Sequence, residues 1–224
     1  MKEIVLDTET TGLSTKDGHR IVEIGCIELD NYVPTKNIFH YYINPEGKKV
    51  SDKAFEVHGY TDEFLSTKKK FKEIADEFLK FIENKKLIIH NAEFDLGHLN
   101  NELSLLGKKK INKENVVDTL ELARNKFPGS LISLDALCKR YRIDNTRRVK
   151  HTAIIDCELL TKVYINLIDQ KEPTLDFDSF NNEKLNINLT DKELYYKKVV
   201  KPSAEQIQLH ESYLKKTLKK NFFN

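Results

Sequence analysis

Short apolar runs alternate with segments of helical periodicity over residues 1–168, and this alternation limits the fold more than any other feature. The apolar runs predict strands at residues 4–6, 21–29, 38–43, 87–89 and 116–117. Apolar residues spaced three and four apart predict helices at about residues 71–82, 96–106, 119–126, 133–141 and 152–168. Strands that alternate with helices after an opening meander are typical of an α/β domain, so we expect a mixed five-stranded sheet flanked by helices.

The chain changes character after residue 168. Residues 169–191 are rich in Asn and Asp, contain Pro173 and lack a helical period, which predicts a linker. Helical spacing returns within residues 192–224, where Ser203 to Gln206 has the spacing of a capping box and begins a short amphipathic helix. We therefore expect a domain at 1–168, a linker at 169–191 and a helical tail at 192–224.

Composition excludes several classes of protein. The 224 residues contain no apolar run of the roughly 20 residues that a membrane span requires. The start of the chain lacks a signal peptide, so we expect a cytoplasmic protein without a membrane partner. The net charge of +2 excludes a protein that grips nucleic acid mainly by phosphate neutralisation. Three cysteines are too few for a disulfide framework or a thiolate zinc site and predict buried thiols.

Two carboxylates, Asp7 and Glu9, lie two residues apart at the end of the first predicted strand. Side chains at this spacing point to the same face of a strand, at the edge where open α/β sheets bind ligands. Paired carboxylate oxygens on one face suit a hard divalent cation. The alternative is that both residues begin a solvated turn before Gly12.

Two further acids follow in later elements. Asp95 lies where the helix after strand 87–89 begins, and the alternative to a functional role is stabilisation of the helix dipole. Asp156 occupies the apolar stripe of the helix at 152–168, between Ala153 and Leu160. Burying a carboxylate on a core-facing stripe destabilises the fold unless a cation or a hydrogen-bond donor contacts it. A metal ion would provide that contact.

His151 precedes Asp156 by five residues, which on a regular helix would rotate it about 140° away. We therefore expect His151 in the loop or cap before the helix, where it suits a base beside the site. The upstream residues Arg147, Arg148 and Lys150 could attract phosphate there, and the alternative is an exposed histidine in a basic loop. His98, three residues after Asp95, is interpreted as a wall residue.

Three segments in this order carry a family resemblance: DTETTGL at 7–13, NAEFD at 91–95 and HTAIID at 151–156. They resemble the three motifs of the DEDD exonucleases that use a histidine base. Linking pieces such as Val57-His58-Gly59 and Phe127-Pro128-Gly129 resemble one branch, the epsilon proofreading subunits of bacterial DNA polymerase III. The likeness covers residues 3–168 and resumes near residue 199 through the last helix.

The resemblance implies a ribonuclease H-like exonuclease fold and release of nucleoside monophosphates from a DNA 3′ end, as the proofreading subunit of a replicative polymerase. Asp7, Glu9, Asp95 and Asp156 match the family's four metal-binding carboxylates, for two Mg²⁺ or Mn²⁺ ions about 3.5 to 4 Å apart. His151 matches the general base. Because a base must be neutral, the rate should fall below about pH 6.5.

The resemblance also implies substrate contacts. Thr8, Thr10 and Leu13 should line the pocket for the terminal nucleotide together with Asp7, Glu9 and Asp156, and His58 should lie close to the substrate. The alternatives are that Leu13 is part of the core and that His58 is a turn residue before Gly59.

In the resembled branch the C-terminal segment docks on the polymerase, so the 192–224 tail is predicted to bind the polymerase catalytic subunit. Residues 172–177 resemble a sliding-clamp-binding peptide, although Leu175 and Phe177 could instead pack on the domain. Two other functions stay open: an RNA 3′-end exonuclease like oligoribonuclease or ribonuclease T, and a non-catalytic subunit that bridges polymerase and clamp.

Overall fold

The computed structural model of the chain describes residues 2–169 and 202–217. These two parts belong to separate compact units and are treated one at a time. The predicted linker beyond Asp169, the clamp-like peptide at 172–177 and the tail residues 192–201 and 218–224 lie outside the described residues. The domain boundaries at 168 and 191 therefore stay predictions.

A six-stranded mixed sheet forms the centre of the first unit, in the order β4-β3-β2-β1-β5-β6. The pairs β1–β2 and β2–β3 are antiparallel, whereas β3–β4, β1–β5 and β5–β6 are parallel. The five predicted strands are confirmed, and β4 is an additional two-residue strand too short and polar to be marked by an apolar run. The strands are β1 (Lys2–Thr10), β2 (Ile21–Asp30), β3 (Val33–Asn44), β4 (Lys69–Lys70), β5 (Lys86–Ile89) and β6 (Val116–Asp118).

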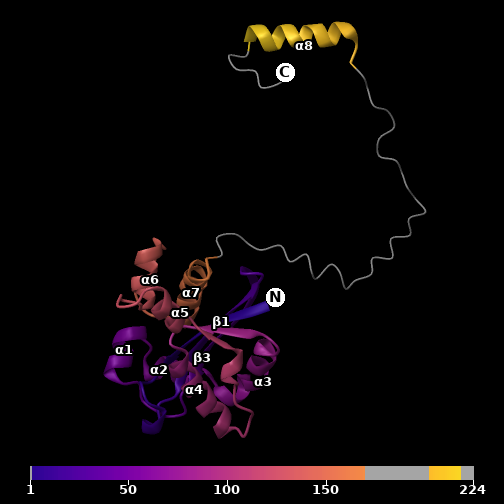
Figure 1. Ribbon diagram of the computed structural model, residues 1–224. Coiled ribbons are helices and arrows are strands. Elements are labelled where there is room, and N and C mark those ends of the chain that lie inside the picture. The colour runs from indigo at the N-terminus through magenta and orange to yellow at the C-terminus, as the bar shows by residue number, and fades with distance from the viewer. Residues whose placement is uncertain (1, 170–201, 218–224) are drawn as a thin grey trace, which may run out of the picture. The chain divides into compact units, whose positions relative to one another are not determined.

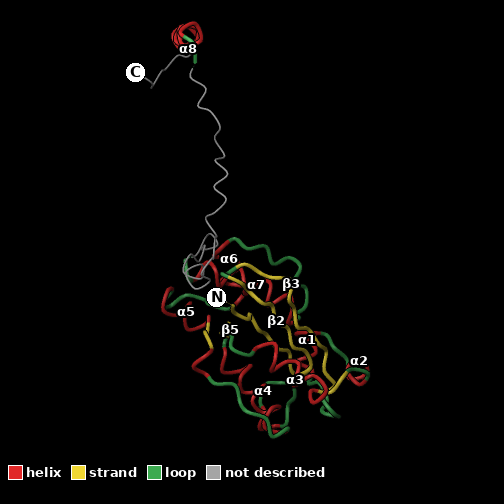
Figure 2. Tube along the Cα trace, turned by 90° about the vertical axis from the view of Figure 1, so that its right-hand side faces the viewer, coloured by secondary structure: helices red, strands yellow, loops and turns green. Residues whose placement is uncertain are grey.

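Helices cover both faces of this sheet (Figures 1 and 2). The five predicted helices of the first unit are confirmed, whereas α1 and α2 were not predicted because they are short and carry few apolar residues. The helices are α1 (Asp52–His58), α2 (Asp62–Ser66), α3 (Phe71–Ile82), α4 (Ala92–Leu105), α5 (Thr119–Lys126), α6 (Leu134–Tyr141) and α7 (Ala153–Leu167), with 3₁₀ turns η1 (Thr15–Asp17) and η2 (Lys113–Asn115).

The strand β1 is buried between two helical layers. Its side chains alternate between the faces of the sheet, as the pleat requires. Ile4 and Leu6 pack in a cluster with α3 and α4, whereas Val5 packs in a second cluster with α5, α6 and α7. The apolar run at residues 4–6 therefore corresponds to a strand covered on both faces, as the sequence predicts.

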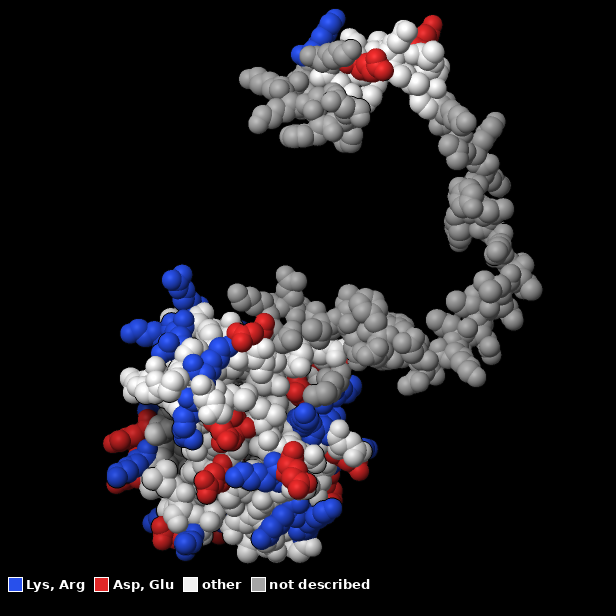
Figure 3. Space-filling view, viewed as in Figure 1, with Lys and Arg blue, Asp and Glu red and all other residues white. Residues whose placement is uncertain are grey.

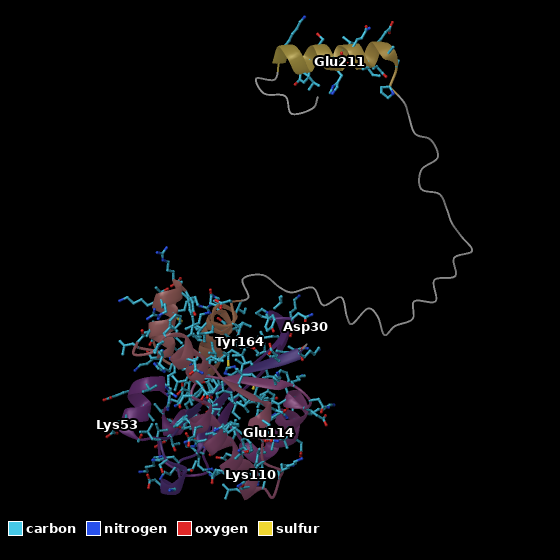
Figure 4. The ribbon with its side chains drawn as sticks, viewed as in Figure 1. Asp30, Lys53, Lys110, Glu114, Tyr164 and Glu211 are labelled. Atoms are coloured by element: carbon cyan, nitrogen blue, oxygen red, sulfur yellow. The ribbon has the colours of Figure 1, made fainter. Side chains whose placement is uncertain are left out.

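Helix α7 lies directly on the sheet. A Cβ atom at Gly25 of β2 would lie 2.6 Å from the carbonyl carbon of Ala153, so only glycine permits this approach. The thiol of Cys157 donates to the Gly25 carbonyl at 3.2 Å. Figure 4 labels Tyr164 near the other end of α7. Its hydroxyl donates to Glu3 Oε1 at 3.0 Å. These contacts fix the face of α7 that meets the sheet.

The second unit contains helix α8 (Ala204–Thr217). The predicted capping box is present, because the Gln206 N–H donates to Ser203 Oγ at 3.3 Å and the Ser203 N–H donates to Gln206 Oε1 at 2.9 Å. Ile207, Leu209 and Tyr213 are exposed apolar side chains on this helix. None of the helices in residues 2–169 and 202–217 is long and apolar enough to cross a membrane.

Candidate active site

The sequence segments that carry the predicted site residues meet around one cavity of about 770 Å³. This convergence of three distant segments could not be derived from spacing along the chain. The cavity is lined by every residue that the sequence proposes for catalysis, metal binding or substrate contact: Asp7, Thr8, Glu9, Thr10, Leu13, His58, Asp95, His151 and Asp156.

Strand β1 sends its side chains to two sides of the cavity. Because Val5 packs toward α7, the alternation of the strand places Asp7 and Glu9 on that same side. Thr8 points to the opposite side, where its N–H and hydroxyl donate to Asp95 Oδ1 of α4 at 3.0 and 2.7 Å. Glu9 is buried, so the alternative of a solvated turn is wrong.

Asp95 is positioned by the carboxylate of Asp118, which caps two helices. Asp118 accepts hydrogen bonds from the N–H groups of Asn91 and Ala92 at 3.1 Å and from Leu120 at 2.9 Å. These bonds fix the start of α4 beside the start of α5. Asp95, one turn into α4, is buried in the cavity wall. A role limited to the helix dipole does not require this burial.

Asp156 and His151 come from the last segment. Asp156 is only 3% exposed on the buried face of α7, which confirms the predicted stripe. His151 lies outside the helix, immediately before the N-cap Thr152, as predicted from the five-residue spacing. Its backbone N–H donates to the carbonyl of Val57 in α1 at 3.1 Å. The His151 loop is therefore tied to the last turn of α1.

Burial, together with the charges of neighbouring carboxylates, raises the pKa values of the acids in the cavity. Burial, followed by the charges of Asp156, Glu23 and Asp95, raises the pKa of Glu9 to about 8. Burial raises the pKa of Asp95 to about 7 against the opposing hydrogen bonds from Thr8. Burial and the charge of Asp95 also raise the pKa of Asp7 well above its usual value. Positive charge placed among these acids would lower their pKa values and stabilise their ionised forms.

The donor set fits a divalent cation. Glu9, Asp156 and His151 each offer a ligand atom, and these atoms lie within 4.8 Å of one another. Carboxylate oxygens dominate the set, which suits Mg²⁺ or Mn²⁺. A bound cation would also relieve the repulsion that raises the pKa values of Asp7 and Glu9.

The proposed substrate contacts form one rim of the cavity. Leu13 is 81% exposed, so the alternative that it is a core residue is wrong. His98 is buried and its Nε2–H donates to the Leu13 carbonyl at 3.2 Å, so it holds this loop without being among the residues that line the cavity. Thr10 Oγ1 donates to the carbonyl of Gly12 at 2.8 Å and holds the same loop.

His58 is the last residue of α1, with Gly59 as the left-handed C-cap, rather than a turn residue. Its Nε2–H donates to the Thr10 carbonyl at 3.2 Å while its Nδ1 accepts from the Tyr60 N–H at 3.0 Å. This pair of bonds requires the neutral ring. Burial lowers the pKa of His58, in agreement with that state.

Glu23 is a residue of the site region that the sequence reasoning missed. This fully buried side chain of β2 accepts hydrogen bonds from the Ala153 N–H at 3.0 Å, the Tyr60 hydroxyl at 2.7 Å and His40 Nε2 at 2.7 Å. It therefore joins the start of α7 to the loop after α1. The available signal was an acid inside the apolar run IVEIGCIEL, which needs buried partners.

Comparison with known proteins gives relatives over nearly the whole chain. Residues 4–164 match a family model described as exonuclease. The DNA polymerase III subunit epsilon of Rickettsia prowazekii is 47% identical over 97% of this chain and 97% of its own length. The Escherichia coli protein of the same description is 48% identical over 73% of this chain and 70% of its own length.

Solved structures share the fold at lower identity. The nuclease domain of 3′hExo, a DEDDh family member bound to rAMP, has a TM-score of 0.66 and 17% identity, covering 76% of this chain and 92% of its own. Exonuclease X in complex with 5′ overhanging duplex DNA has a TM-score of 0.59 and 23% identity, covering 75% and 92%. The predicted ribonuclease H-like exonuclease fold is confirmed.

Proposed function

This chain belongs to the exonuclease family, in the branch of the DNA polymerase III epsilon subunits, and we propose that it trims mispaired DNA 3′ ends as a proofreading subunit. The observation that carries the proposal is the meeting of four acids and one histidine at a single cavity. A bridging subunit without catalysis would have no use for buried carboxylates that destabilise one another.

Asp7, Glu9, Asp95 and Asp156 would hold two divalent cations, Mg²⁺ or Mn²⁺. When bound, such ions supply positive charge to the scissile phosphate and favour deprotonation of the attacking water. Thr8 supports this role because it fixes one oxygen of Asp95 through two hydrogen bonds. Glu23 would position Asp156 indirectly, because its bond to the Ala153 N–H holds the start of the helix that carries Asp156.

His151 would take the proton of the attacking water at a ring nitrogen. Its placement supports this role, because the loop position leaves its side chain 42% exposed at the cavity while the backbone is tied to Val57. Burial lowers the pKa of His151, which favours the neutral ring near pH 7.

The substrate would be held locally rather than by a broad charged surface. On the face of the first unit shown in Figure 3, basic and acidic side chains are interspersed rather than gathered by sign. The exposed side chain of Leu13 offers an apolar surface for the terminal base beside the acids. Recognition of the last nucleotide, with few phosphate contacts upstream, suits an enzyme that samples 3′ ends.

The test compares release of single nucleotides from a 3′-mispaired DNA primer, a paired primer and a short RNA oligomer, with Mn²⁺ and with chelator. We expect release to require the cation and to be fastest from the mispaired primer, because frayed ends reach the cavity at the lowest unpairing cost. Faster trimming of the RNA would favour the RNA exonuclease alternative. Absence of release from all three by the folded protein would favour the bridging subunit.

We also propose that the tail at 192–224 binds the polymerase catalytic subunit and that residues 172–177 bind the sliding clamp. The exposed apolar side chains of α8 support the first part. We expect Ile207→Glu to weaken co-purification with the polymerase catalytic subunit of the same organism, with nucleotide release from free DNA unchanged. The exposed neighbour Gln208 supplies the control Gln208→Glu. Equal binding by both variants would contradict the role of this helix face.

A further inference from the structure

Arg148 lies among the residues that the proposed function assigns to catalysis. Its Nε and Nη2 donate to the two oxygens of Asp156, each at 2.6 Å. Its Nη1 donates to Asp135 Oδ2 of α6 at 2.6 Å. The Arg148 side chain is only 7% exposed, so this bidentate pair is shielded from water. The sequence indicated a phosphate contact for Arg148, but the guanidinium is engaged inside the protein.

The pair with Arg148 opposes a cation at Asp156. Each carboxylate oxygen keeps a second lone pair, so the hydrogen bonds alone leave room for a metal ligand bond. The obstacle is charge, because a guanidinium and a divalent ion on the same oxygens repel strongly in a buried site.

Arg148 also acts on His151. The Nη2 atom lies 3.0 Å from His151 Nδ1, and because a guanidinium only donates, Nδ1 must accept. The neutral ring then carries its proton on Nε2. Neither nitrogen has a free lone pair in this arrangement, so His151 cannot take a proton from water while Arg148 stays in place.

We propose that Arg148 is a positioning residue that holds Asp156 and His151 and that a divalent cation, when it binds, displaces Arg148 from both. Asp135 keeps the displaced side chain nearby, since its half-exposed carboxylate accepts from Arg148 Nη1. Displacement frees both oxygens of Asp156 and the Nδ1 lone pair of His151 in one movement. The inference rests on the proposed function, because it takes the acids as the cation site.

Direct binding of Mn²⁺ to the full chain tests this, with free Mn²⁺ followed by electron paramagnetic resonance. A residue with a merely structural role would weaken binding when it is replaced. Displacement predicts the reverse, so Arg148→Gln should tighten Mn²⁺ binding by about five- to 150-fold, the usual range for coupled ligands. Arg148→Lys keeps the charge but loses the bidentate hydrogen bonding of the guanidinium, so it should tighten Mn²⁺ binding by less than Arg148→Gln does.

Arg147 provides the matched control. It is 76% exposed and contacts only the surface residue Glu158, at 3.4 Å, among the interactions described for it. Arg147→Gln removes the same charge one residue away and should leave Mn²⁺ affinity unchanged. Thermal unfolding in chelator gives a second readout, in which Arg148→Gln should lower the melting temperature and gain more from added Mn²⁺ than the parent chain.

The outcomes distinguish failure of the displacement from failure of the proposed function. Unchanged or weaker Mn²⁺ binding by Arg148→Gln, with normal binding by the parent chain, would overturn the displacement and leave the proposed function standing. Tighter binding by Arg148→Gln with parent-like binding by Arg148→Lys would support the displacement and assign the obstacle to the charge of residue 148. No Mn²⁺ binding by the folded parent chain would overturn the proposed function and the displacement together.

Discussion

Replacing Asp7 with asparagine should abolish nucleotide release and, at the same time, stabilise the metal-free protein. The amide would keep the size of the side chain but lose the charge that a cation needs, so we expect kcat to fall at least about 100-fold. The stability gain follows from the burial and the charge of Asp95 that raise the pKa of Asp7. A neutral amide removes a charge that the folded state disfavours.

The gain should depend on pH with a definite sign. A carboxyl whose folded pKa is raised binds its proton more tightly in the folded state, so its favourable contribution is lost as pH rises. For Asp7, whose usual value is 3.8 and whose folded pKa lies well above it, this loss falls in the pH range above about 3.8. The advantage of Asp7→Asn in chelator should therefore grow over this range.

Melting temperatures of both chains, measured from pH 5 to 8 in chelator and then in Mn²⁺, check the prediction. We expect the variant to melt about 3–6 °C higher at pH 8 without metal, since 1 kcal/mol shifts a chain of this size by about 2–4 °C. Added Mn²⁺ should reverse the order. Asp76→Asn, at a carboxylate 86% exposed, is the control and should change neither activity nor stability. An active or destabilised Asp7→Asn would contradict the assignment.

Periodicity predicted the elements that build the site better than the contacts that complete it. The apolar stripe of α7 placed Asp156 on the buried face, and the five-residue spacing placed His151 outside the helix, as observed. Both inferences depend only on geometry within one helix. The short helix α1 was missed, although its last turn anchors the His151 loop through Val57.

Hydrogen-bond partners from distant segments are harder to predict from sequence. Glu23 interrupts an apolar run, which indicates a buried acid, but its partners Tyr60 and Ala153 lie 37 and 130 residues away. Arg148 looks like any basic loop residue until the fold brings Asp135 and Asp156 around it. Hydrogen bonds of this kind are decided by which loops meet, and no local pattern encodes that meeting.

Replacing His151 with glutamine should lower kcat by about 10²- to 10⁴-fold, the usual contribution of a positioned base. The remaining activity should lose the acid limb that a titrating histidine imposes. Burial lowers the pKa of His151, so the parent chain should lose its rate at a lower pH than an ordinary histidine would dictate. The structure thus moves the limb to a lower pH than an unperturbed histidine would give.

The measurement must separate this acid limb from protonation of the carboxylates. Glu9 has a pKa of about 8, so protons compete with a bound cation for its carboxylate. Saturating Mn²⁺ and substrate at each pH remove that competition from kcat. His210→Gln on α8, an exposed position, is the matched control and should retain both rate and limb. If His151→Gln kept the parent acid limb, a different group would be the base, and the tie between the His151 loop and α1 would serve structure alone.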